Sequence, residues 1–248
     1  MKDKAKKDWK RRVVGVMICI GAGAVVYTEA LNLFAWRLAQ SAGEAHPNLS
    51  ILPVPLQSIP LAQLNGVRVV HFGFSFQVPW KDIAQDRVTK DWAASISFRD
   101  GGGLLIFNPS AQVDGATTMH GSTLGERKTM ESILGKLALS SNYEFMAAEV
   151  EATPDQVKWW NSRRQATRNA ILLINKSGDL RSSHEMYKLA SGKLRGFQFG
   201  DPAVAPYIVQ LDLFDPSDRH YRIFVTPSKQ NQAVISQAQI NALIASIQ

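Results

Sequence analysis

The sequence has almost no cysteine, and its histidines are scattered. Cys19 is the only cysteine among 248 residues and lies inside an apolar run, which excludes an intrachain disulfide, a Cys-x-x-Cys pair and a thiol nucleophile. The five histidines form no His-Glu-x-x-His motif and no pair three or four residues apart, so a helix-borne metal pair is excluded. Gly-x-Ser-x-Gly elbows and Gly-Lys-Ser/Thr phosphate loops are also missing. We therefore expect no catalytic residue, no cofactor and no bound metal.

A broadly basic surface is missing as well, although the net charge is +7. Seven of the 28 basic residues and two of the 21 acidic ones lie in residues 1–12, which leaves a nearly balanced 21 and 19 for the rest of the chain. The high isoelectric point therefore comes from a basic head at residues 1–12. A nucleic-acid partner is not expected, because such proteins spread their positive charge over a folded surface.

A long uncharged run follows the basic head. Residues 13–28 (VVGVMICIGAGAVVYT) rise about 24 Å as a helix, and extending the helix to Trp36 gives about 36 Å, enough to cross a hydrocarbon core of roughly 30 Å with tilt. Because basic residues stay on the cytoplasmic side, we predict a single transmembrane helix with an amphipathic continuation at residues 13–40. The N-terminus is then cytoplasmic, and the remaining chain is periplasmic or otherwise extracytoplasmic. A cleaved signal peptide and a buried soluble helix stay open as alternatives.

Two patterns of side chains, one apolar and one of small residues, lie within this segment. Leu31, Phe34, Ala35 and Leu38 have the spacing of an apolar helical stripe, which predicts that the continuation lies near the membrane surface or packs on a partner. The small residues Gly15, Cys19 and Gly23 share one helix face and could form a helix-pairing seam. Small residues are also common in membrane helices, so the seam has an ordinary explanation too.

The rest of the chain divides into a spacer and a domain. Residues 41–62 hold four prolines, which predict an extended, semi-rigid spacer, but their many apolar side chains indicate that part of it rests on the domain or on a partner. Residues 63–248 are long enough to bury one ordinary core. We expect one extracytoplasmic domain there.

Strand and helix patterns set the expected fold of this domain. Apolar alternation predicts a strand before Pro79, a hairpin over residues 92–108 and a second hairpin over residues 207–226. Capping signals predict helices over residues 123–140, from Pro154 to about Lys176, and after Ser236. Because strand–helix–strand alternation is not maintained, the fold class is α+β, with an antiparallel sheet packed by helices.

Two stretches of the domain resemble a known family. The sequence GFSFQVPW at residues 73–80 with the hairpin after it, and ISQAQINALIASIQ at residues 235–248, resemble PsbP-like domains. The resemblance implies an antiparallel sheet sandwiched by helices and an accessory or assembly role on an energy-converting membrane. It covers about 40 residues, and no functional residue carries over.

The candidate interface lies on the helix expected after Pro154. Trp159 and Trp160 precede Arg163, Arg164 and Arg168, and an i, i+4 spacing would place the Arg163 guanidinium on the Trp159 ring. Tryptophan and arginine are common interface anchors. Anionic headgroups are a second possible target. The alternative is a solvated helix face with one tryptophan in the core.

Other constellations have ordinary explanations. His120 and Ser122 near a predicted helix start could serve catalysis, but a loop and a helix cap are the favoured explanation. Asp212, Asp215 and Asp218 lack EF-hand spacing and suit a strand and a turn. His71 and His220 are expected to be solvated on their strands.

The favoured function is a membrane-anchored, non-enzymatic accessory or scaffold subunit of a membrane protein complex. Its partners are membrane lipid and other membrane protein subunits. The alternative is an extracytoplasmic module that binds a small molecule or lipid in a groove between sheet and helices, lined by the phenylalanine-rich strand near residue 74. An enzyme is the third and least favoured reading.

Overall fold

The structure, a computed structural model, describes most of the chain from residue 30 onward. The described residues are 30–56, 61–89, 91–99, 101–109, 128, 131–179, 185–191, 193–227 and 235–248. The basic head, the apolar run of residues 13–28 and the small-residue row of Gly15, Cys19 and Gly23 lie outside them, as do His120 and Ser122. Predictions on these residues stay predictions.

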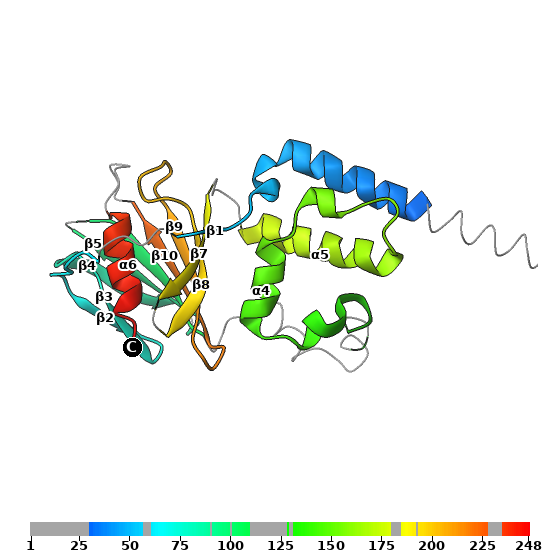
Figure 1. The fold of residues 1–248 in the computed structure, drawn as a ribbon. Helices are drawn as coiled ribbons and strands as arrows, with labels where there is room; N and C mark the ends of the chain where they lie inside the picture. Colours follow the sequence, from blue (N-terminus) through cyan, green and yellow to red (C-terminus); the bar gives the residue numbers. More distant parts are fainter. Residues whose placement is uncertain are drawn as a thin grey trace, which may run out of the picture.

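A large, mostly antiparallel sheet packed by helices confirms the α+β fold class (Figure 1). Eight strands follow the order β1-β7-β8-β9-β10-β6-β5-β4, in which β1 and β7 are parallel and the other described neighbours antiparallel. Two further strands form a separate hairpin. The bounds are β1 Val54–Pro55, β2 Arg68–His71, β3 Phe74–Gln77, β4 Ile83–Thr89, β5 Ala93–Phe98, β6 Gly103–Phe107, β7 Met186–Ser191, β8 Leu194–Phe199, β9 Val209–Phe214 and β10 His220–Thr226.

Both predicted hairpins of the large sheet are present. In β5 and β6, Ile96 pairs with Leu104, and both are buried while the serines between the apolar residues of β5 are exposed. The glycine turn between these strands serves close packing, because a Cβ at Gly101 would lie 2.0 Å from the indole nitrogen of the buried Trp80. In the turn between β9 and β10, Asp215 Oδ1 accepts hydrogen bonds from two backbone N–H groups, as turn chemistry predicts.

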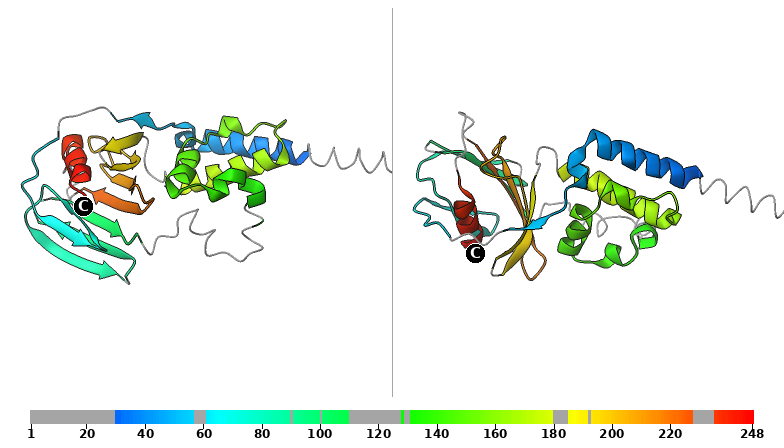
Figure 2. Two further views of the ribbon diagram at one scale, coloured as in Figure 1. Left: turned by 60° about the horizontal axis from the view of Figure 1, so that its bottom comes forward. Right: turned by 45° about the horizontal axis from the view of Figure 1, so that its top comes forward.

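The sheet buries both faces, against different elements (Figures 1 and 2). The β2–β3 hairpin and α6 (Gln237–Ala245) cover the face that holds the largest apolar core. Ser236 and Gln239 form the predicted capping box of α6, and Ile240 and Leu243 are fully buried. The opposite face, toward β8, packs against α4 (Asn142–Val150).

The remaining helices form a helical layer beside the sheet (Figure 1). It consists of the helix of residues 30–45, a helical turn at residues 131–134, and η2 Gly135–Leu139, α4, η3 Pro154–Gln156 and α5 Arg163–Asp179. Its apolar core includes Leu134, Phe145, Val157 and Leu172. Residue 30 and the start of α5 lie at the edge of this layer that is farthest from the sheet.

The turn after β9 joins the two layers. Asp218 accepts hydrogen bonds from the backbone N–H groups of Asn142, at 2.5 Å, and Tyr143, at 3.1 Å, so a carboxylate from the sheet caps the start of α4. Beside it, the Arg195 guanidinium lies 4.0 Å from the centroid of the Tyr143 ring. Phe214 and Tyr143 also meet edge to face. The helical layer is therefore fixed to the sheet through α4.

The single helix predicted from Pro154 to about Lys176 is wrong. The chain makes one short turn at η3, Val157 then leaves the helix with an extended ψ of 103° and fills the core, and α5 begins only at Arg163. The start of α5 has its own capping pair, since Ser162 N–H donates to Gln165 Oε1 and Gln165 N–H donates to Ser162 Oγ. Trp159 and Trp160 therefore lie in a turn.

The proline-bearing segment of residues 41–62 contacts the folded part wherever it is described. Residues 41–45 continue the first described helix, η1 (Pro47–Ser50) follows, and β1 pairs with β7 at the edge of the sheet. Leu49 is buried, and Leu56 packs against the core between the sheet and α6. Part of this segment thus rests on the domain, as predicted, whereas Leu52, Val54 and Leu61 stay exposed.

Within the described residues, no helix combines the length and the apolarity that crossing a bilayer requires.

Candidate functional site

The Trp159–Trp160 turn exposes two neighbouring aromatic rings at the surface of the helical layer. Trp159 is 48% and Trp160 64% exposed, and their rings meet edge to face with centroids 5.4 Å apart. The cation beside the pair is Lys158, whose Nζ lies 5.9 Å from the Trp160 centroid. Because α5 begins at Arg163, Trp159 and Arg163 do not share a helical turn, and the predicted contact between them is wrong.

Neither tryptophan belongs to the core, so the alternative with one buried tryptophan is wrong too. The turn is nevertheless held in place. The Asn32 amide, which is 6% exposed, donates to Asn161 O at 2.7 Å, and Asn161 Nδ2 donates in turn to Gln156 O at 2.9 Å. These hydrogen bonds place the tryptophan pair beside the beginning of the described helix of residues 30–45. Ordered, exposed aromatic rings at one edge of a layer are typical of a binding surface.

The helix of residues 30–45 has one buried face and one exposed apolar face. Asn32, Ala39 and Gly43 face the rest of the helical layer, and a Cβ at Gly43 would lie 2.9 Å from Pro154 Cγ. Phe34 is 66% and Leu38 60% exposed, because successive residues rotate by about 100° and these two fall on the opposite side. Of the predicted apolar stripe, Phe34 and Leu38 therefore point outward from the domain, whereas Leu31 and Ala35 are half-buried.

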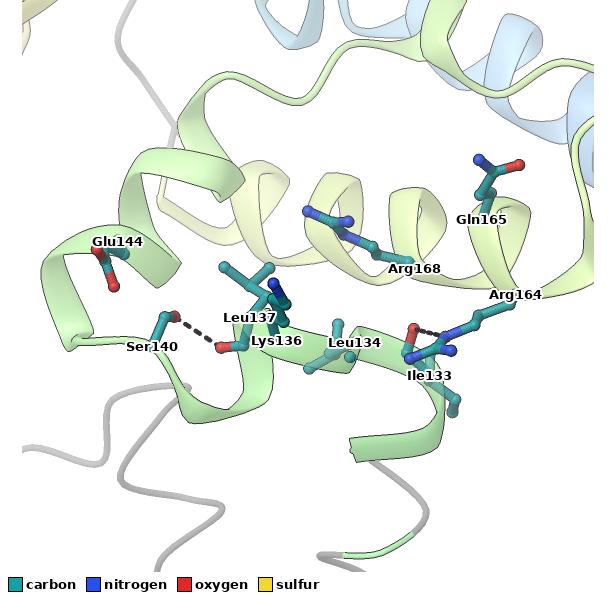
Figure 3. A pocket seen from close by; sticks show the side chains of 10 residues that line it. Ile133, Leu134, Lys136, Leu137, Ser140, Glu144, Arg164, Gln165 and Arg168 are labelled. Atoms are coloured by element: carbon teal, nitrogen blue, oxygen red, sulfur yellow. Dashed lines mark hydrogen bonds between the residues drawn. The ribbon is translucent and has the colours of Figure 1, made fainter.

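A pocket of about 660 Å³ lies between η2 and α5, and we call it the α5 pocket. Its floor is apolar, from Leu134 and Leu137, and its lining includes the cations Lys136, Arg164 and Arg168 (Figure 3). Glu144 lies at the α4 end, where its carboxylate accepts a hydrogen bond from Ser141 N–H in the capping box of α4. The pocket is thus apolar inside with an excess of positive charge.

The three predicted arginines have different surroundings. Arg163 is exposed on the first turn of α5 and does not line the pocket. Arg164 reaches across to the helical turn of residues 131–134, where it donates to Ile133 O and Glu131 O, both at 3.4 Å, and a Cβ at Gly135 would lie 2.6 Å from its guanidinium. Arg168 is half-buried, and its Nε atom is buried with no hydrogen-bond partner among the described residues.

A buried polar network lies in the sheet, away from this surface. Asp212 is fully buried; its Oδ1 accepts from Arg222 Nε at 2.5 Å and contacts His220 Nε2 at 2.6 Å, and its Oδ2 accepts from Gln210 Nε2 at 2.6 Å. Burial raises the pKa of the Asp212 carboxyl, but the Arg222 charge and the His220 hydrogen bond outweigh it and hold the pKa below its ordinary value. His220 is 2% exposed, so its predicted solvation is wrong.

The three aspartates considered for calcium are separately engaged. Asp212 belongs to the buried network, Asp215 to the turn and Asp218 to the cap of α4. The described residues hold no group of three or more side chains suited to a metal ion. The structure therefore gives each carboxylate a structural contact of its own.

The predicted groove along the phenylalanine-rich strand is wrong. Phe74 and Phe76 of β3 are 3% and 1% exposed, and Phe74 packs edge to face on Tyr221 at 4.9 Å. They fill the core between the sheet and α6. The α5 pocket is a candidate for a ligand site in the described part of the chain.

Lys176 is a buried titratable residue that the sequence patterns did not single out. It is fully buried on α5, and its Nζ donates to Ile51 O and Ala152 O, both at 2.7 Å. Burial lowers its pKa to about 8, although the charge of Glu149 opposes the shift. Lys176 follows Leu172 by four residues and Leu173 by three, so helical spacing puts it on the same buried face. That spacing is the feature of the sequence that indicates its burial.

Compared with family models, curated proteins and solved structures, the chain gives no match. The PsbP-like resemblance therefore stays a prediction, and the functional argument rests on the geometry alone.

Proposed function

We propose that the chain is a single-pass, membrane-anchored accessory subunit of a membrane protein complex, without catalytic activity of its own. Residues 13–40 form its transmembrane helix with the amphipathic continuation, the basic head is cytoplasmic, and the described domain lies in the periplasm or another extracytoplasmic space. Membrane lipid and other membrane protein subunits are its partners, and nucleic acid is not.

The observation that supports this proposal most is the position of the helix of residues 30–45. It follows the uncharged run after one residue, Glu29, and its buried face is fixed to the domain through Asn32 and Gln40, which donates to Pro154 O at 3.0 Å. A membrane helix connected in this way carries the domain as one body. A flexible linker would leave the two independent.

The exposed surfaces at this edge suit two partners. The Trp159–Trp160 turn, with Lys158 beside it, has the composition of a membrane-interface anchor and lies at the same edge as residue 30 (Figure 1). The outward stripe of Phe34 and Leu38 suits helix pairing with another subunit. The sheet lies on the far side of the helical layer, away from that edge.

The test uses the full-length chain in its own membrane. We expect Phe34→Ser with Leu38→Ser to abolish stoichiometric co-purification and cross-linking of a membrane subunit in mild detergent, while the variant stays in the membrane after carbonate extraction. A matched control is Val70→Ser with Val88→Ser, which removes two exposed apolar side chains from strands β2 and β4. Recovery of the wild-type chain alone, without any fixed-ratio partner, would contradict the subunit proposal.

A module that binds a small molecule or lipid stays a second candidate, because the α5 pocket is of ligand-binding size. The pocket lies within the helical layer, so it replaces the groove expected between sheet and helices.

A further inference from the structure

Two cations of the α5 pocket have no partner within the described part of the chain. Lys136, on η2, and Arg168, on α5, make no hydrogen bond or ion pair with a described group, and Figure 3 shows both side chains at the pocket. The Nε atom of Arg168 is buried without an acceptor. A buried donor that is left unpaired is unfavourable, and a bound anion would satisfy it.

The chemistry of the pocket favours phosphate as that anion. A guanidinium presents its N–H groups in a fixed fork that matches phosphate oxygens, and an ammonium adds a second, mobile charge. Glu144, the acid of the lining, already binds the backbone at the start of α4. Arg164 is held on the carbonyls of the helical turn at residues 131–134 and forms a wall of the site.

The size and the floor of the pocket favour a phosphate that carries an apolar tail. A volume of about 660 Å³ is in the range of small-molecule clefts and exceeds what one inorganic anion fills. Leu134 and Leu137 would leave an inorganic phosphate against apolar surface, whereas glycerol and acyl carbons gain from that contact.

We propose that the α5 pocket binds the phosphate head of an acidic phospholipid, with Arg168 and Lys136 on the phosphate and the apolar floor beneath its glycerol and first acyl carbons. α5 begins at the same edge of the helical layer as residue 30, which would bring the pocket toward the headgroups of the membrane that anchors the chain (Figure 1). The proposal rests on the proposed membrane location for the supply of lipid, while binding itself can be measured in detergent.

The test is binding to the full-length protein in a neutral detergent, measured by isothermal titration. Three probes are compared, namely dioctanoyl phosphatidic acid, dioctanoyl phosphatidylcholine and inorganic phosphate. We expect saturable binding of the phosphatidic acid, at least tenfold weaker binding of the other two, and a Kd raised at least tenfold by Arg168→Gln. Arg163→Gln is the matched control, because it removes the same charge from the same helix outside the pocket, and its Kd should stay within twofold of wild type.

Lys136→Gln provides a second variant should Arg168→Gln fail to fold, and we expect it to raise the Kd at least fivefold. Equal binding of phosphatidic acid and inorganic phosphate would show a free-phosphate site and overturn the lipid assignment. Equal weakening by Arg163→Gln, or no saturable binding, would overturn the site itself. Carbonate extraction of the same protein from membranes tests the anchor separately, so a failed pocket and a failed anchor are distinguishable.

Discussion

Replacing Asp212 by asparagine removes one charge from the interior of the sheet and keeps the shape of the side chain. The carboxylate is fully buried and lies within 2.6 Å of polar nitrogens from Gln210, His220 and Arg222. The asparagine oxygen can still accept hydrogen bonds, but the carboxylate charge is lost and the asparagine NH2 group cannot accept from Gln210 Nε2. The variant therefore tests electrostatics with little change in packing.

The expected loss can be worked from these three contacts. A hydrogen bond to a charged group contributes about 1.5–3 kcal/mol, roughly twice a neutral one, so three such bonds lose about 2–4 kcal/mol together. Breaking a buried ion pair costs about 3–5 kcal/mol in general. Because the Arg222 side chain is 23% exposed, water offsets part of the loss, and we expect about 3 kcal/mol.

The assay is urea unfolding of the full-length protein in detergent, followed by circular dichroism at pH 7. With a slope of about 2 kcal/mol/M, Asp212→Asn should lower the midpoint by about 1.5 M. Glu151→Gln is the control, because it removes a carboxylate whose partner Lys188 lies 3.7 Å away at the surface, with both side chains about half exposed. That surface pair should contribute under about 0.5 kcal/mol.

The buried network around Asp212 also determines how the stability of the protein changes at acidic pH. The pKa of Asp212 is lower in the folded protein than in the unfolded chain, so its contribution to stability is present above about pH 4 and is lost as the pH falls further. The wild-type protein should lose stability below pH 4 more steeply than Asp212→Asn. Two results would refute the reasoning. One is an equal urea midpoint for Asp212→Asn and Glu151→Gln at pH 7. The other is an equally steep loss of stability below pH 4 for Asp212→Asn and the wild type.

Three further predictions concern single contacts. Since the pKa of Lys176 is about 8 when folded and 10.5 when unfolded, stability should rise between about pH 8 and 9.5, and Lys176→Met should abolish the rise in urea midpoint; a flat wild-type profile would contradict this. Asp218→Ala should cost about 1 kcal/mol and speed amide exchange in the first turn of α4, whereas unchanged exchange there would argue against the cap. In vesicles of brominated phosphatidylcholine, bromine quenches the fluorescence of tryptophans that contact lipid. Trp159→Phe with Trp160→Phe should therefore reduce the fraction of the fluorescence that bromine quenches, whereas Trp92→Phe should remove only fluorescence that bromine does not quench. The opposite pattern would count against contact of the turn with lipid.

The strands with apolar alternation were predictable from the sequence. In β5 and β10 every second side chain enters the core, so period two is visible and the hairpins follow from their turns. β4 shows the limit, because all seven of its side chains are exposed and its backbone pairing alone makes it a strand. Pairing of that kind leaves no apolar pattern in the sequence.

The helical layer was predicted less well, for two physical reasons. Ser141-Asn142-Tyr143-Glu144 is a capping box that the sequence displays, and reading it would have placed α4. The break before α5 depends on Val157 filling the core and on the Asn161 hydrogen bonds, which are tertiary contacts. Local propensity carries no information on them.

The candidate site was predictable in part. Both indoles after Pro154 are exposed, whereas Arg164 and Arg168 line the α5 pocket. The α5 pocket was not predictable, because Lys136 and Arg168 are 32 positions apart and meet only through the packing of η2 against α5. The buried position of His220 was missed because a polar residue opposite an apolar stripe usually faces solvent.

The side of the membrane on which the domain lies tests the central claim most directly. Cys19→Ser leaves a chain without cysteine, and Ser217→Cys then adds one thiol on the exposed turn between β9 and β10. A membrane-impermeant maleimide applied to cells with an intact inner membrane should label this thiol fully, with the labelled chain retained in the carbonate-washed membrane. Labelling only after the membrane is disrupted, or release of the chain by carbonate, would contradict the account.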